Sequence, residues 1–305
     1  MLFPSVISAS SQCVAPACLT LDLGGQWHGL HQEKQQRELV AQQQEQAKAA
    51  LPTIYLVTPT YARSSQHVDL TRFCYTIRQV PKVHWIVVED AEVHSPEVRR
   101  ILNDCEVAFS HLVALTPPRE NAQICRKVDS QPRGVKQRNT GLVELRRLLS
   151  LNGGRDGVVY FADDDNTYSL EIFERMRHIK AVGVWRVAFV GGLSYEGPVV
   201  DMGPNGPRIS GWHVAWATDR KYPVDMAAFA LNTRLITAQP DVYFPTHALD
   251  GHLETDFLSA VVPEGVELEP LGFELDRVLV WHTRTELPNL RQEGKLPPDR
   301  RPIII

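Results

Sequence analysis

The chain has 305 residues, of which 43% are hydrophobic and 22% are charged, and its formal net charge is −4 at pH 7. This is the composition of an ordinary globular protein, which excludes a largely disordered chain. Because lysine and arginine are spread along the sequence and the net charge is negative, nucleic acid is excluded as the main partner. The five cysteines show no spacing typical of a metal site and leave the redox compartment open.

The N-terminal region differs in character from the rest of the chain. Residues 1–30 are interrupted by Ser, Gln and Pro and lack the basic flank of a signal peptide. No stretch reaches the roughly 20 apolar residues of a membrane-spanning helix, so we expect a soluble chain. Residues 31–50 are helix formers with almost no apolar stripe, which predicts an exposed helical spacer. We therefore predict a boundary near Pro52, between an N-terminal segment of residues 1–51 and a globular region of residues 52–305.

Apolar, β-branched runs then alternate with helical patterns. The predicted strands lie at 54–58, 83–89, 111–116 and 157–162, with helical patterns between them. This alternation predicts an α/β fold, in which a mainly parallel sheet is covered by helices on both faces. Because ligands of such sheets bind beyond the carboxyl ends of the strands, we expect the polar residues that follow these strands to form one site.

The second half of the globular region has shorter segments. From about residue 185 to 305 the sequence is richer in Gly, Pro and Trp, which indicates mixed or antiparallel structure and a helix near 252–261. We interpret 52–168 as one half of the region and 185–305 as a second lobe on the same sheet. Trp212 and Trp216 are predicted to alternate along one extended run, either as a subsite where a sugar stacks or as part of the core.

The fourth predicted strand runs directly into Asp163, Asp164 and Asp165. Carboxylates this close repel one another and cost stability unless a cation or a heavily hydrogen-bonded turn compensates them. An EF-hand calcium loop fails as an explanation, because the sixth residue counted from Asp163 is Tyr168 and not glycine. The string therefore predicts a bound cation of another kind or an unusual turn.

Three interpretations of these aspartates stay open. Asp163, Asp165 and Thr167 match the Asp-x-Asp-x-Thr nucleophile motif of haloacid-dehalogenase-type phosphatases. In the second interpretation one carboxylate binds Mn²⁺ or Mg²⁺ that bridges a nucleotide diphosphate, while its neighbours hold the ribose. The third is an acidic helix N-cap formed by Asn166 or Asp165. The late position of the string in the α/β region favours the nucleotide interpretation.

Other polar residues begin predicted helices or follow predicted strands. Arg133 and Arg138 flank a helix start, which suits a phosphate or a base edge but also an ordinary solvated basic face. His282 and Arg284 follow an apolar run and point to the same side of an extended chain, as a diphosphate clamp would. Glu254 follows a glycine turn at a helix start, where it is either a general base or an ordinary first-turn acid.

Taken together, these motifs resemble the β-1,3-glucuronyltransferases, glycosyltransferase family 43, which have the GT-A fold. The segments that carry the resemblance are VTPTYAR, HWIVVEDAE, PRGVKQRN, VVYFADDDNTYS, SYEGPVV, YPVDMAAFA, GHLET and VLVWHTRTE. The resemblance implies an inverting enzyme that transfers glucuronic acid from UDP-glucuronate to the 3-hydroxyl of a terminal galactose, with manganese (Mn²⁺) as cofactor. It also implies a Golgi homodimer, held at the membrane by an anchor that this sequence does not show.

The resemblance also implies a role for each motif. The donor would contact Pro59, Thr60, Tyr61, Asp90, Arg133, Arg138, Asp163, Asp164, Asp165, His282, Thr283 and Arg284. Asp165 would be the protein ligand of Mn²⁺, and Glu254 would be the catalytic base. The acceptor, a galactose-terminated glycan on a protein, would contact Glu196, Trp216, Arg220, Asp225 and Gln292. Gln292 would reach the acceptor bound by the other subunit of the dimer.

A few positions bear on the acceptor. Trp216 and Gln292 resemble enzymes acting on the proteoglycan linkage tetrasaccharide more than relatives acting on N-acetyllactosamine glycans. Asp250 departs from the linkage-enzyme pattern, because a basic residue is expected there. This departure and the missing anchor keep a second class in view, a non-catalytic paralogue that binds UDP.

Overall fold

The computed structural model describes residues 23–116, 133–153, 157–204, 206–286, 289 and 291. The chain divides into two compact units, Met1–Ala49 and Ala50–Ile305. The described part of the first unit is helical and belongs to α1 (Leu23–Ala50), whose residues from 34 onward are exposed. This confirms the helix expected at 31–50. Over the described ranges, no helix is both long enough and apolar enough to cross a lipid bilayer.

The second unit is built on a seven-stranded sheet with the order β11-β6-β10-β4-β1-β2-β3. Its strands are β1 (Thr53–Thr60), β2 (Val83–Glu89), β3 (Ala108–Val113), β4 (Gly157–Phe161), β6 (Val182–Val184), β10 (Phe229–Asn232) and β11 (Glu269–Pro270). β1 runs parallel to β2 and β4, and β2 runs parallel to β3. Among these described strands, only β10 is antiparallel to its neighbours. This topology confirms the expected α/β fold with a mainly parallel sheet.

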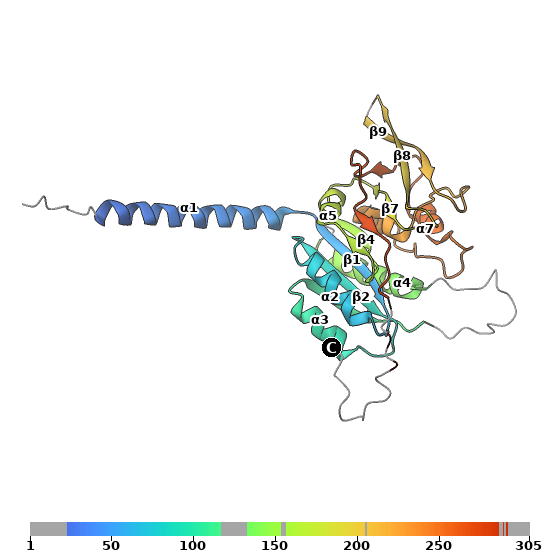
Figure 1. Ribbon diagram of the computed structural model, residues 1–305, viewed down its shortest axis with the longest axis horizontal. Coiled ribbons are helices and arrows are strands. Elements are labelled where there is room, and N and C mark those ends of the chain that lie inside the picture. The colour runs from blue at the N-terminus through green and yellow to red at the C-terminus, as the bar shows by residue number, and fades with distance from the viewer. Residues whose placement is uncertain are drawn as a thin grey trace, which may run out of the picture. The chain divides into compact units, whose positions relative to one another are not determined.

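The helices of this unit connect and cover the strands (Figure 1). They are α2 (Gln66–Ile77), α3 (Pro96–Asp104), α4 (Val135–Leu151), α5 (Leu170–Met176), α6 (Thr233–Ala238) and α7 (Leu253–Val261), with a short 3₁₀ helix η1 (Met226–Ala228). The helix expected near 252–261 is α7. Thus the helical patterns between the predicted strands correspond to real helices.

The helices cover both faces of the sheet, as the alternation of side chains along β1 shows. Leu56 lies opposite Trp85 of β2, whose indole packs edge-on against Phe73 of α2. The next residue, Val57, points to the other face, where α4 packs. A Cβ on Gly141 of α4 would lie 2.4 Å from Val57 Cγ1. Glycine at this position therefore permits the close approach of α4 to β1.

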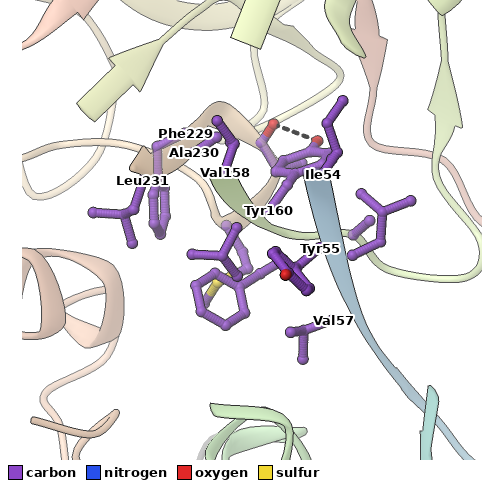
Figure 2. Close-up of a cluster of buried hydrophobic side chains, with 14 of the residues drawn as sticks. Ile54, Tyr55, Val57, Val158, Tyr160, Phe229, Ala230 and Leu231 are labelled. Atoms are coloured by element: carbon purple, nitrogen blue, oxygen red, sulfur yellow. Dashed lines mark hydrogen bonds between the residues drawn. The ribbon is translucent and has the colours of Figure 1, made fainter. Parts of the chain in front are cut away.

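The hydrophobic core includes the central strands of this sheet, from which Figure 2 shows a cluster of side chains. The labelled residues, each at most 2% exposed, are Ile54, Tyr55 and Val57 of β1, Val158 and Tyr160 of β4, and Phe229, Ala230 and Leu231 of β10. Burial on both faces explains why these strands are near-continuous apolar runs in the sequence.

A second sheet, order β5-β12-β7-β8-β9, lies outside the expected architecture. Its strands are β5 (Thr167–Tyr168), β7 (Val187–Ala188), β8 (Tyr195–Gly203), β9 (Gly206–His213) and β12 (Val280–Trp281). In Figure 1 the hairpin of β8 and β9 extends away from the main sheet. The expectation of a second lobe on one sheet is therefore only partly right, because β6, β10 and β11 join the main sheet and these strands do not.

The expected extended run through both tryptophans is wrong. Trp212 lies in β9, but the strand ends at His213, before Trp216. Ala217 then has a φ of 47°, in the left-handed region that turns use. Trp212 packs against the core, whereas Trp216 is 52% exposed. The two indoles thus have different environments, and Trp216 is the more exposed of the two.

A disulfide bond joins Cys74 of α2 to Cys105, the residue that caps α3. Both cysteines are buried. The cysteine spacing did not indicate this pair, because disulfide connectivity depends on which helices pack together. A disulfide that closes a long loop constrains the unfolded chain and persists mainly in oxidising compartments.

Candidate active site

The carboxyl ends of β1, β2 and β4 meet at one edge of the main sheet. A cavity of ≈ 490 Å³ opens there, a volume typical of small-molecule sites. Nine of the residues predicted to hold a nucleotide donor line it: Pro59, Thr60, Tyr61, Asp90, Arg133, Arg138, Asp163, Asp164 and Asp165. Thr116, Gly134 and Gln137 line it as well, and the sequence reasoning did not single them out.

Asp90, directly after β2, is held by Thr116. The Thr116 N–H donates to Asp90 Oδ1 at 2.6 Å, and its hydroxyl donates to Oδ2 at 2.7 Å. Gln137 in turn donates to Thr116 Oγ1 at 3.1 Å. Since an ionised carboxylate has about four acceptor positions, Asp90 can still accept from a ligand. The signal for Thr116 was its place at the end of the third predicted strand, where site residues were expected.

Two side chains of the cavity lining are pre-arranged. Tyr61 is 49% exposed, and the guanidinium of Arg63 lies 4.7 Å from its ring centre, which leaves one ring face open for stacking. Arg138, at the start of α4, is 5% exposed and donates from Nη2 to Asp163 Oδ1 at 2.5 Å. A Cβ on Gly134, the N-cap of α4, would lie 2.5 Å from Arg138 Nη1. The glycine therefore leaves room for this arginine.

The acidic loop after β4 is not a helix cap. Ser169 caps α5, accepting from the Glu171 N–H, so neither Asn166 nor Asp165 fills that role. Asp164 accepts hydrogen bonds from the Thr60 hydroxyl and from Arg63, both at 2.7 Å. Desolvation by burial nevertheless raises the pKa of Asp164.

Asp165 differs from Asp163 and Asp164, whose carboxylates are each paired with an arginine. Burial, followed by the negative charges of Asp164 and Asp163, raises the pKa of Asp165 to about 6. Within the part of the chain that the structure describes, its carboxylate has no hydrogen-bond partner, although its backbone carbonyl accepts from the Thr283 hydroxyl at 2.7 Å. A cation beside this carboxylate would relieve both the burial and the repulsion.

The acidic loop could hold a divalent cation only together with a bound substrate, because it offers too few side chains of its own. The described residues contain no group of three or more His, Cys, Asp or Glu side chains able to hold a metal ion. An ion at Asp165 would therefore take most of its ligands from phosphate and water. Mg²⁺ usually binds in this way at nucleotide sites, through one or two carboxylates plus substrate phosphates.

The segment after β12 lies beside the acidic loop. The Thr283 N–H donates to Asn166 Oδ1 at 3.3 Å, which ties the segment to that loop. His282 Nδ1 lies 3.5 Å from Asp225 Oδ2, and the interaction with Asp225 raises the pKa of His282. His282 and Arg284 line a second cavity of ≈ 350 Å³. The segment thus places His282 and Arg284 beside the acidic loop, with Thr283 holding its backbone.

Phe189 lines the same cavity, with Val190 and Gly191. Its phenyl ring is 62% exposed, and its φ is 64°, which is uncommon for a residue other than glycine. The sequence reasoning missed this residue. The available signal was an aromatic side chain shortly before a Gly-Gly turn.

Glu254 is the second residue of α7 and is partly exposed. Burial of its carboxyl group, followed by the charge of Asp225, raises the pKa of Glu254 to about 7, although Arg138 and Arg220 act in the opposite direction. A carboxylate with this pKa is matched to proton transfer near neutral pH. Glu254 therefore interacts electrostatically with Arg138, which lines the cavity at the strand ends, and with Arg220.

Arg220 supports the loop that carries Trp216. Its guanidinium donates to the carbonyls of Gly251 at 2.7 Å, Ala217 at 3.0 Å and Trp216 at 3.2 Å. Gly251 has a φ of +76°, and a Cβ there would lie 1.8 Å from Trp216 Cζ3. Only glycine allows the indole to pack this closely against the turn before α7.

The remaining predicted residues are dispersed around this region. Glu196 is 6% exposed, and its Oε1 accepts from the Ala215 N–H at 3.5 Å. Asp225 caps η1 through the Ala227 N–H at 2.9 Å and reaches His282 with its other oxygen. Gln292 falls outside the described residues.

Comparison with known proteins identifies the family. The model for glycosyltransferase family 43 matches residues 73–286. The chain belongs to glycosyltransferase family 43. The matched range includes the acidic loop, Glu254 and His282, whereas Pro59, Thr60 and Tyr61 precede it and Gln292 follows it.

Three human relatives of this family 43 enzyme are similar over most of its length. Galactosylgalactosylxylosylprotein 3-beta-glucuronosyltransferase 3 of Homo sapiens is 48% identical over 255 residues, which cover 81% of this chain and 75% of the relative. Galactosylgalactosylxylosylprotein 3-beta-glucuronosyltransferase 1 of Homo sapiens is 44% identical, over 80% of this chain and 72% of the relative. Galactosylgalactosylxylosylprotein 3-beta-glucuronosyltransferase 2 of Homo sapiens is 42% identical, over 92% of this chain and 82% of the relative.

Among solved structures, residues 1–349 of S. aureus TarS have a TM-score of 0.46 with this chain at 16% identity, covering 76% of this chain and 60% of that one. As a family 43 member, the protein is an enzyme, a glycosyltransferase. Such an enzyme needs a donor site, an acceptor site and, for inversion, a base between them. The cavity at the strand ends, the exposed Trp216 and Glu254 are the candidates for these three parts.

Proposed function

We propose that this enzyme transfers glucuronic acid from UDP-glucuronate to the 3-hydroxyl of a terminal galactose, with inversion at the anomeric carbon. The observation that carries the proposal is Glu254, a carboxyl group with a pKa of about 7 that is coupled to Arg138 of the cavity and to Arg220 beside Trp216. The relatives described above are named for glucuronosyl transfer to galactosylgalactosylxylosylprotein.

The cavity at the carboxyl ends of the strands would hold the uridine. The open face of Tyr61 would stack on uracil, with Pro59 and Thr60 beside it, and Asp90 would accept from the imide N–H. Arg133 and Arg138 would complete the base and sugar contacts. Asp163 and Asp164 would accept hydrogen bonds from the ribose hydroxyls. All these side chains line the same cavity.

The diphosphate would lie between the acidic loop and the segment 282–284. His282 and Arg284 would donate to its oxygens, and Thr283 would fix their backbone through Asn166 and Asp165. Asp165 would be the protein ligand of Mn²⁺, whose charge stabilises the departing diphosphate when the ion is bound.

Glu254 would act as the general base. Its carboxylate would remove the proton from the acceptor 3-hydroxyl as that oxygen attacks the anomeric carbon and the bond to UDP breaks. Attack on the face opposite the leaving group converts the α-linked donor into a β-linked product. Raising the pKa of Glu254 to about 7 makes the carboxylate a stronger base than an ordinary glutamate.

The acceptor would lie against the exposed indole of Trp216. Glu196, Arg220 and Asp225 would also contact the acceptor, and Gln292 would reach over from the second subunit of a homodimer. The acceptor we propose is the galactosyl-galactosyl-xylosyl linkage region of a proteoglycan, as the names of the relatives suggest. The same chemistry on N-acetyllactosamine glycans is the alternative.

The cellular setting we propose is the Golgi lumen, with residues 1–51 as a spacer and 52–305 as the catalytic domain. The buried Cys74–Cys105 disulfide supports an oxidising compartment, because such bonds are rare in the reducing cytosol.

The proposal is tested by UDP release from UDP-glucuronate by the purified chain with Mn²⁺. A galactosyl-β-1,3-galactosyl acceptor, N-acetyllactosamine and no acceptor are compared. Release that depends on the digalactoside supports the proposal, and preference for N-acetyllactosamine moves the enzyme to the alternative acceptor. Tight UDP binding without release on any acceptor would identify a non-catalytic protein.

Replacing Gly251 by alanine is expected to impair the acceptor side selectively. The new Cβ would displace the Trp216 indole, since it would lie only 1.8 Å from Cζ3 of that ring. We expect the acceptor KM to rise about tenfold or more, because small displacements of positioning groups are costly, while UDP affinity stays unchanged. Steady-state kinetics with both substrates and calorimetric UDP binding measure this.

Gly265→Ala is the matched control, because Gly265 has a φ of +80° and a Cβ added there would have no atom within 4 Å. It introduces similar backbone strain without touching Trp216. If UDP affinity in Gly251→Ala fell by as much as the acceptor KM rose, the Trp216 loop would not be specific to the acceptor.

A further inference from the structure

A buried charge network lies next to the nucleotide cavity and contains two residues without an assigned role, Arg63 and Asp69. Asp69 of α2 is 0% exposed. Arg63 Nη2 donates to Asp69 Oδ2 at 2.9 Å and to Asp164 Oδ1 at 2.7 Å. One guanidinium nitrogen therefore joins a helix carboxylate to the acidic loop.

The second oxygen of Asp69 is joined to the segment after β12. Asp69 Oδ1 accepts from the Thr285 hydroxyl and, at 2.7 Å, from Arg72 Nη2. Arg72 Nη2 also lies 2.8 Å from Thr285 Oγ1. Thr285 directly follows Arg284, so Asp69 fixes the C-terminal side of the residues that line the second cavity.

Arg63 also reaches the aromatic side of the cavity. Its guanidinium lies 4.7 Å from the Tyr61 ring centre, and Nη1 donates to the Tyr61 carbonyl at 3.4 Å. Through Arg63 and Thr285, Asp69 is thus connected to Tyr61, Asp164 and Arg284, which come from three separate parts of the sequence.

Burying such a network gives a fold little net stability, because desolvation of the charges offsets their attraction. Its geometric effect is larger, since a fully paired carboxylate locks the orientation of every partner. We propose that Asp69 is a positioning residue for a nucleoside diphosphate donor. It orients Arg63 and Thr285 so that the stacking ring, the ribose-facing carboxylate and the diphosphate-facing arginine meet one ligand. The inference rests on the proposed function.

The test compares Asp69→Asn with Glu144→Gln. Glu144 of α4 is 8% exposed and is also paired with an arginine and a hydroxyl, Arg147 and Ser110, but it does not line the cavity. Both substitutions remove the charge of a buried carboxylate at nearly constant shape. UDP affinity with Mn²⁺ is measured by calorimetry, and the KM values for UDP-glucuronate and acceptor are measured separately.

We expect Asp69→Asn to weaken UDP binding and raise the donor KM about 10- to 100-fold, as loss of a supporting contact typically does. The acceptor KM should stay unchanged, Asp69→Glu should recover part of the affinity, and Glu144→Gln should bind UDP normally. If Asp69→Asn does not fold, Thr285→Val removes one contact of the network and should also weaken UDP binding.

Several results would overturn the inference. Unchanged UDP affinity in Asp69→Asn, or in Thr285→Val if that variant is needed, refutes it while the proposed function stands. Equal losses in Asp69→Asn and Glu144→Gln show a purely structural effect and refute it as well. Wild-type protein that binds no UDP refutes both proposals. If Asp69→Asn weakens UDP binding but the wild type transfers no glucuronate, the inference is supported and the proposed function is refuted.

Discussion

Glu254→Gln is expected to lower kcat by about 10²- to 10⁴-fold, the contribution typical of a general base. UDP affinity should remain nearly unchanged, because the base acts on the acceptor hydroxyl in the transition state. Single-turnover kinetics and calorimetric UDP binding measure the two quantities. Asp256→Asn is the matched control, since Asp256 is an exposed acid in the same first turn of α7, and it should retain full activity.

The pH dependence of the wild type tests the same assignment. Because the pKa of Glu254 is raised to about 7, kcat/KM at saturating Mn²⁺ should rise with pH through about 7, and Glu254→Gln should lack this dependence. An unchanged pH profile in Glu254→Gln, or a collapse of UDP affinity equal to the loss of kcat, would assign the base elsewhere.

The thermal stability of Glu254→Gln shows whether the variant has lost only the catalytic base or has also lost its fold. A carboxyl group with a raised pKa binds protons more tightly in the folded state, so its contribution to stability falls as pH rises from the unfolded pKa to about 7. Glutamine removes this cost. The melting temperature of Glu254→Gln at pH 8 should therefore equal or exceed that of the wild type.

Asp165→Asn is expected to abolish Mn²⁺-dependent UDP binding and to lower transfer by about 10²- to 10³-fold, since a catalytic metal supplies several kcal/mol of charge stabilisation. The substitution keeps the shape of the side chain but removes the charge that a cation would bind. Mn²⁺ titrations with and without UDP, followed by calorimetry, measure the loss.

A chelator provides the control for this variant. EDTA should reduce wild-type transfer to the level of Asp165→Asn and have no further effect on the variant. The melting temperature of Asp165→Asn should not fall at neutral pH, because burial and repulsion already disfavour the ionised carboxylate, whose pKa is about 6. Retention of Mn²⁺-dependent UDP binding by Asp165→Asn would mean that other groups hold the ion.

Much of the cavity could be predicted because its residues occupy equivalent local positions. Tyr61, Asp90 and Asp163 each follow a strand of a parallel sheet, and the carboxyl ends of such strands meet at one edge. The third strand was placed less well. It was expected at 111–116 but spans Ala108–Val113. Its end is earlier than expected because the Ala114 carbonyl accepts a hydrogen bond from the Gln137 side chain and the Thr116 N–H donates to the Asp90 carboxylate.

The sequence by itself determined the alternation of strands and helices, the chemical character of the strand ends and the family, because each is encoded in local patterns or contiguous motifs. Only the tertiary structure decided the second sheet, the Cys74–Cys105 pair and the network around Asp69. The Asp69–Thr285 contact spans 216 positions, and no local pattern records such a pairing. Those contacts arise when the packed helices and strands bring distant polar groups together, away from water, where each must find a partner.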